Sequence, residues 1–127
     1  MERVVERVKL QNFLAPDKVL ERDAVIDPSS IMMALPQNLI NALGLRKIRE
    51  DSVRNKNNRL EQKSVYAGLL LEIKGRAGTF DVIAEPEGTE PVVGEIVLTS
   101  LDLVVEPRTH TLIPNPRSPE MPMVEIL

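Results

Sequence analysis

The chain has 127 residues, which suits one domain that buries roughly two thirds of its unfolded surface. Hydrophobic residues make up 43% of it and aromatic residues only 2%, so aliphatic side chains must form the core, and their β-branched share favours strands. Ten prolines and six glycines interrupt the chain too often for long helices. There is no cysteine, and a single histidine, His110, argues against a catalytic triad or a multi-histidine metal site. We therefore expect a mostly β protein with no metal and no cofactor.

The net charge is −3 with both signs interspersed, which gives no general attraction to nucleic acid. Residues 46–63 hold seven basic side chains, but three acidic ones interrupt them and no aromatic residue is present to stack on bases. We interpret this segment as a solvated hairpin face. Residues 1–11 lack the apolar centre of a signal peptide, and no apolar run is long enough to span a membrane. A cytoplasmic protein without a membrane or nucleic-acid partner is expected.

Two strands are predicted at the start of the chain. Apolar side chains alternate over residues 4–10, and a second apolar segment covers residues 19–26. Between them, Pro16 and Asp17 predict a turn over residues 13–18.

The second strand ends in a continuous apolar triplet, Ala24-Val25-Ile26, which is typical of a strand buried on both faces. The turn-forming residues Asp27-Pro28-Ser29-Ser30 follow it directly. Because a charged side chain at the mouth of a buried strand is costly unless something satisfies it, Asp27 is the first candidate functional residue.

One short helix is predicted over residues 36–43. Pro36 suits its first turn, Gly44 suits its C-terminal stop, and three apolar residues have the spacing of a buried helical stripe: Leu39, Ile40 and Leu43. Beyond it, residues 53–60 predict a hairpin with a polar tip that includes Asn55, Lys56, Asn57 and Asn58.

A long strand over residues 62–74 has the clearest alternation in the chain. Gly75 and Gly78 predict a tight turn that leads into a strand over residues 79–85, so these two strands should form a hairpin.

A loop at residues 86–91 leads into Val92-Val93-Gly94 and a short helical segment over residues 95–101. Closing strands are predicted at residues 103–105 and 111–113. We expect one domain, residues 1–113, followed by a proline-rich tail or dimerisation arm, residues 114–127.

In this order the pieces resemble the retropepsin-like aspartic proteases, in particular their small bacterial and archaeal members. The apolar triplet and Asp27 match the start of the family pattern, followed by Leu35-Pro36, Leu43-Gly44-Leu45, a flap hairpin and the glycine box Val92-Val93-Gly94. The resemblance covers about residues 3–116, and the order and spacing of the pieces make it specific. It implies a closed β-barrel or sandwich with one or two short helices.

The resemblance also implies a homodimer that binds an extended peptide under its flaps, residues 55–58 here, because each chain supplies one catalytic aspartate. Two carboxylates that share a proton then act as general base on a water and general acid on the scissile carbonyl. The chain departs from the family at this point. Pro28 replaces a threonine that donates its hydroxyl across the dimer, and Ser29 replaces a glycine. Ser29 or Ser30 could supply a substitute hydroxyl.

Three functions remain open. The first is a pseudo-protease that binds an extended peptide or a protein partner without cutting it, with Asp27 capping its own turn. The second is an active dimeric aspartic endopeptidase that uses Asp27 from each chain. The third is a regulatory subunit that pairs with an intact protease chain. We rank them in this order.

Overall fold

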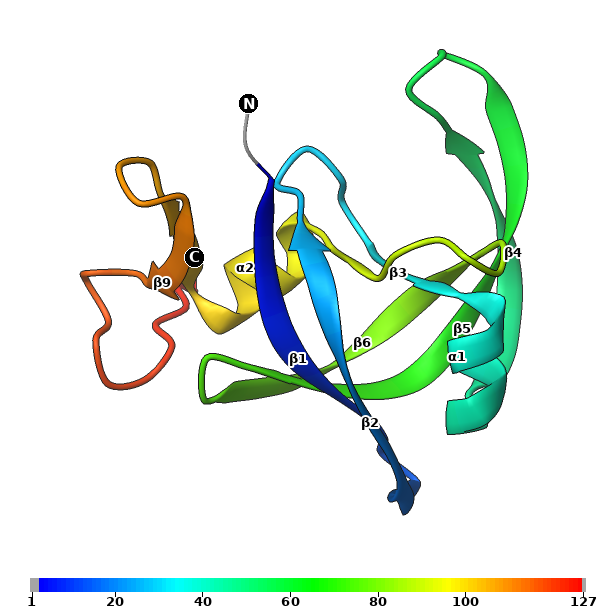
Figure 1. The fold of residues 1–127 in the computed structure, drawn as a ribbon, viewed down its shortest axis with the longest axis horizontal. Coiled ribbons are helices and arrows are strands. Elements are labelled where there is room, and N and C mark those ends of the chain that lie inside the picture. The colour runs from blue at the N-terminus through cyan, green and yellow to red at the C-terminus, as the bar shows by residue number, and fades with distance from the viewer. Residues whose placement is uncertain (1–2, 127) are drawn as a thin grey trace.

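The computed structural model describes residues 3–126 and confirms a mostly β architecture (Figure 1). Its main sheet has seven strands, and the pairing of β1 with β5 closes the sheet on itself. In sheet order the strands are β1 (Val4–Asn12), β2 (Ala15–Ile26), β7 (Val92–Val93), β3 (Met33–Pro36), β6 (Arg76–Glu85), β5 (Leu60–Ile73) and β4 (Arg46–Arg54). Two helices accompany the sheet, α1 (Gln37–Leu43) and α2 (Glu95–Leu101). Neither they nor any other part of residues 3–126 forms a helix long and apolar enough to cross a membrane.

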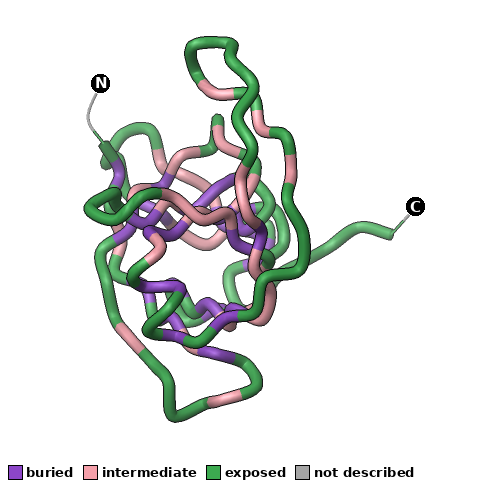
Figure 2. The backbone as a smooth tube through the Cα atoms, turned by 90° about the vertical axis from the view of Figure 1, so that its right-hand side faces the viewer, coloured by how far each residue is buried: buried purple, intermediate pink, exposed green. Residues whose placement is uncertain are grey.

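The core is built from residues of the closed sheet, of both helices and of the chain after α2, and its buried residues are aliphatic, as the composition predicts (Figure 2). The alternation in β5 is confirmed, because four of its five predicted inward residues are almost fully buried: Val65, Leu69, Leu71 and Ile73. The fifth, Ala67, is only partly buried. It lies where the pairing with β6 shifts register, next to Gly68 at a φ of 92°. A bulge of this kind turns side chains away from the regular alternation.

The predicted turn over residues 13–18 is too long. The chain reverses at Phe13 and Leu14, and β2 already begins at Ala15. Pro16 lies with its two successors in a bulge, because Asn12 pairs with Ala15 whereas Gln11 pairs with Val19. Proline is tolerated there because a bulged residue needs no N–H for the ladder. Pro16 and Asp17, on which the prediction of a turn rests, therefore mark a bulge.

The hairpin between β5 and β6 is confirmed, but its turn is shorter than predicted. Lys74 and Gly75 both have left-handed backbone, with φ of 52° and 75°, which is the geometry of a two-residue hairpin turn. Gly78 lies inside β6 and packs against side-chain atoms of Phe80 and Leu101.

Helix α1 ends as predicted, with Gly44 in the left-handed conformation at a φ of 66°. The buried Asn12 amide donates to the carbonyl oxygens of Leu43 at 2.8 Å and Gly44 at 3.2 Å, so β1 is tied to the end of this helix. These bonds satisfy helix carbonyls that have no intrahelical partner.

The predicted closing strands, β8 (Leu103–Glu106) and β9 (Thr111–Pro114), pair with each other in a separate two-stranded sheet. Beyond β9 the chain is held by Asp102, whose carboxylate accepts hydrogen bonds from Ser118 Oγ at 2.6 Å, Arg117 Nη2 at 3.1 Å and the Met123 N–H at 3.2 Å. The buried Arg76 donates to the carbonyl oxygen of Asp102 at 2.9 Å and to that of Ser118. The segment predicted as a tail or arm is therefore anchored to Asp102 by Arg117, Ser118 and Met123, and the stretch beyond these contacts projects from the body (Figure 2).

Candidate functional site

Asp27 directly follows β2, at the point where β2 runs parallel to β7. Its backbone N–H donates to the Val93 carbonyl oxygen at 3.0 Å, which continues the ladder in which Ile26 is paired with Val93. The apolar triplet before Asp27 therefore lies beside the two valines of the glycine box, and this pairing fixes the start of the Asp27 turn.

The turn 27–30 is organised around the Asp27 carboxylate. Oδ1 accepts the Ser29 backbone N–H at 3.0 Å and the Ser29 hydroxyl at 2.5 Å, and Oδ2 accepts the Ser30 hydroxyl at 3.2 Å. The Ser30 N–H donates to the Asp27 carbonyl oxygen at 3.1 Å and closes the turn. Both serine hydroxyls therefore bind the Asp27 carboxylate of their own chain. Pro28 has no N–H to contribute, and its side chain has no polar atom.

These contacts hold the pKa of Asp27 below its ordinary value. The hydrogen bond from the Ser29 hydroxyl is the largest cause, and partial burial opposes it. The Ser29 N–H, the Ser30 hydroxyl and the positive charge of Lys56 lower the pKa further. Because each of these donors prefers a negatively charged acceptor, the turn stabilises the ionised carboxylate.

The glycine box holds the other side of this turn. A Cβ on Gly94 would lie 2.5 Å from the Met32 carbonyl oxygen and 2.7 Å from that of Ile31, which is too close for any side chain. The close approach lets the Glu95 N–H donate to the Ser30 carbonyl oxygen at 2.7 Å and the Ile96 N–H to that of Ile31 at 2.9 Å. Glycine is required here because backbone packs directly on backbone.

A cleft of about 310 Å³ opens beside Asp27. Its lining comes from the Asp27 turn and β3, from the end of β6 with the following loop, and from the β4–β5 hairpin: Asp27, Ser30, Met32, Ala34, Lys56, Glu85, Thr89, Glu90 and Val92. Figure 1 shows the tip of the β4–β5 hairpin projecting beyond the barrel. The predicted flap and the predicted catalytic residue therefore border one cleft.

Of the four predicted flap residues, Lys56 alone lines this cleft. The asparagines shape the tip. The Asn55 side-chain oxygen accepts the N–H groups of Asn57 at 2.9 Å and Arg59 at 3.1 Å, and Asn58 takes a left-handed φ of 62°. Asparagine adopts left-handed backbone more readily than most residues, and the predicted hairpin tip depends on this property.

Sequence reasoning missed five residues of the cleft: Met32, Ala34, Glu85, Thr89 and Glu90. Strand β3 runs parallel to β6, and Pro36 pairs with Glu85, so this long-range pairing brings the two segments together. A signal for Met32 and Ala34 was present in the alternation with the fully buried Met33 and Leu35, which face the core.

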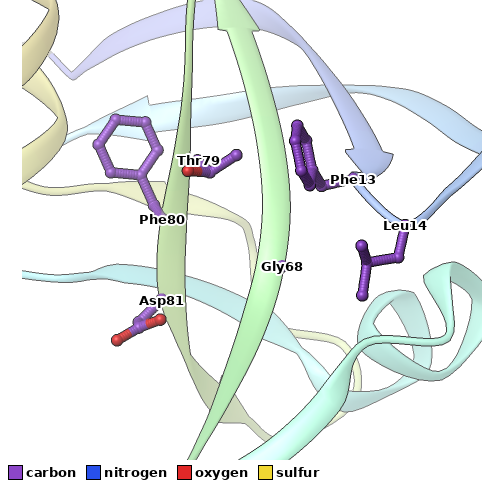
Figure 3. A pocket seen from close by; sticks show the side chains of 6 residues that line it. All are labelled: Phe13, Leu14, Gly68, Thr79, Phe80 and Asp81. Atoms are coloured by element: carbon purple, nitrogen blue, oxygen red, sulfur yellow. The ribbon is translucent and has the colours of Figure 1, made fainter.

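A second hollow, of about 230 Å³, lies on the barrel away from Asp27 (Figure 3). Phe13 and Leu14 from the β1–β2 turn, Gly68 from β5 and Thr79, Phe80 and Asp81 from β6 line it. Its one charged residue, Asp81, is paired with Arg49 at 3.7 Å.

Comparison with known proteins decides the fold. No protein-family model matches the sequence, and a search of curated proteins finds no relative. Among solved structures, the EIAV protease complexed with the inhibitor HBY-793 superimposes with a TM-score of 0.60 over 76% of this chain and 86% of that one. The chain has the retropepsin fold. At 13% sequence identity the likeness establishes the fold alone and assigns no chemistry to the Asp27 site.

Proposed function

We propose that the chain is a retropepsin-like domain that binds an extended peptide or protein segment and has lost efficient proteolysis. The hydrogen bonding of Asp27 is the observation that carries this proposal. Three donors from its own turn occupy the two carboxylate oxygens and favour the ionised form. An aspartic dyad works through a proton shared between two carboxylates, one of which must act as an acid. A carboxylate stabilised as an anion is a poor partner in such sharing.

Pro28 also supports the loss of efficient proteolysis. The resemblance assigns this position to a threonine that stiffens the dyad by donating its hydroxyl to the partner chain. Proline offers neither that hydroxyl nor an N–H. A dyad without this support is held less tightly, and small losses of alignment reduce rates by orders of magnitude.

Binding is supported by the cleft itself. Met32, Ala34 and Val92 give it apolar walls, while Ser30 in the Asp27 turn and Thr89 in the loop add polar groups. A concave site of this volume with a few polar groups suits side chains of an extended chain. The backbone of a hairpin can add hydrogen bonds by strand pairing.

The proposed assembly is a homodimer whose two-fold axis passes near Asp27. Ile31 and Ile96, joined by a backbone hydrogen bond beside the Asp27 turn, are 67% and 48% exposed. Apolar side chains next to a site that is half of a dyad are suited to a self-complementary contact, in which the same surface serves both copies.

An active endopeptidase is the second candidate, because Asp27 still lines the cleft and still accepts the Ser29 N–H. One experiment separates the two. The double variant Pro28→Thr, Ser29→Gly restores a hydroxyl at position 28, removes the Ser29 hydroxyl and allows close backbone approach. If the turn disables the site, this variant should cleave a peptide pool faster than the wild type, and adding Asp27→Asn should abolish the gain. Efficient Asp27-dependent cleavage by the wild type would favour the second candidate instead.

A further inference from the structure

Three acidic side chains line the cleft, and two of them form an ion pair. Glu85 accepts Lys63 Nζ at 2.7 Å, and Glu90 is paired with Arg3. Asp27 and Lys56 both line the cleft, and within residues 3–126 neither has an ion-pair partner within 4.0 Å. The cleft therefore has an anion on its floor and a cation on its hairpin that face the same space without touching.

We propose that Lys56 is an electrostatic latch: it draws the tip of the β4–β5 hairpin onto the Asp27 carboxylate and closes the empty cleft, so a ligand must displace it. The inference rests on the proposed function in one respect, that the cleft is where a ligand binds. The attraction itself needs only the two charges and a hairpin that can move.

The hairpin tip is bonded within itself and has little contact with the barrel. Hydrogen bonds to Asn55 hold it together, and residues 54–61 are exposed or only partly buried. No apolar side chain of residues 55–59 anchors the tip to the barrel, because this segment contains none. A compact tip on an exposed two-stranded stem can approach or leave the cleft without breaking its own bonds.

A latch of this kind also bears on the dyad. In a homodimer two Lys56 side chains would face two Asp27 carboxylates. Opposite charges favour the ionised form of an acid, so the lysines would allow both carboxylates to stay charged where an aspartic dyad shares a proton. Lys56 would then be a positioning residue for the hairpin and a further reason for weak catalysis.

The test compares Lys56→Gln with Lys56→Arg, which keeps the charge, and with Arg59→Gln, which removes a cation from the same tip outside the cleft lining. NMR reads the pKa of the Asp27 carboxyl and the amide exchange of residues 55–59. Lys56→Gln should raise the pKa of Asp27 and speed exchange at the tip by about 1.5- to 5-fold, the range for an exposed ion pair. Lys56→Arg and Arg59→Gln should leave the pKa of Asp27 and the amide exchange of the tip near their wild-type values. The other acidic residues of the cleft, Glu85 and Glu90, are the same in all variants.

Salt provides an independent test of the latch. About 1 M salt shortens the screening length to about 3 Å, so it should remove the differences in Asp27 pKa and in tip exchange between the wild type and Lys56→Gln. Equal values for Lys56→Gln and Arg59→Gln would overturn the latch. Peptide binding is measured separately with a neutral peptide pool, for which Lys56→Gln should increase affinity by about the same factor. If the NMR differences appear but no peptide binds, the latch stands and the proposed function fails. If peptide binds the wild type and Lys56→Gln with equal affinity, the proposed function stands and the latch fails.

Discussion

Gly94→Ala should destabilise the protein strongly because the glycine box is packed backbone against backbone. A Cβ at position 94 would lie 2.5 Å from the Met32 carbonyl oxygen, and real Cβ contacts essentially never fall below 3.0 Å. The segment 31–32 must therefore retreat by about half an ångström, which strains the hydrogen bonds from Glu95 and Ile96 at 2.7 and 2.9 Å. Overpacking costs about 1–3 kcal/mol and each lost hydrogen bond about 0.5–1.5 kcal/mol, so the free energy of unfolding should fall by about 2–6 kcal/mol.

Urea unfolding followed by circular dichroism measures this loss, and the midpoint should fall by about 1–3 M. Gly78→Ala is the matched control. Its new Cβ would meet only side-chain atoms, of Phe80 at 3.1 Å and Leu101 at 3.3 Å, which can shift by a few tenths of an ångström. We expect it to change stability by less than about 1 kcal/mol. The reasoning is refuted if Gly94→Ala is as stable as the wild type, or if Gly78→Ala is equally damaging.

Three further predictions follow from the same contacts. Sedimentation at micromolar concentration should give a dimer, and a monodisperse monomer would contradict the two-fold axis near Asp27. Limited proteolysis should nick residues 55–59 first, because the tip has no apolar anchor; a tip that resists while the barrel is cut would argue against a moving hairpin. The pKa values of Asp27 and Asp102 lie below their ordinary range, so the stability they contribute is present above about pH 4 and is lost as the pH falls below it. As the pH falls, the urea midpoint should therefore decrease less steeply in Asp102→Asn than in the wild type. Equal pH dependence of the two midpoints would show that the Asp102 carboxylate contributes no pH-dependent stability.

The sequence predicted the elements whose cause is local. Alternation along β5, the left-handed stop at Gly44 and the turn after Ile26 all follow from neighbouring residues, and all are confirmed. Pro16 and Asp17 predict a turn but lie in a bulge, because a bulge and a turn favour the same residue types.

Other features depend on segments that meet only in the folded chain. Sequence reasoning could place Asp27 in a turn, but it could not tell that both serine hydroxyls point at the carboxylate. The contacts of Arg76 and Arg117 with Asp102 were also missed, because they join residues 15 to 26 positions apart with no shared motif. Such pairs are set by topology, and a single sequence carries no trace of them.

Peptide cleavage by the unmodified protein, with Asp27→Asn as the reference, tests the central claim most directly. The purified chain is incubated with a mixed peptide pool between acid and neutral pH, and mass spectrometry follows both the peptides retained on the protein and the fragments released. We expect peptides to be retained intact, with no cleavage above that of Asp27→Asn at any pH. Rapid release of fragments that disappears in Asp27→Asn would contradict the account and identify a working aspartic endopeptidase.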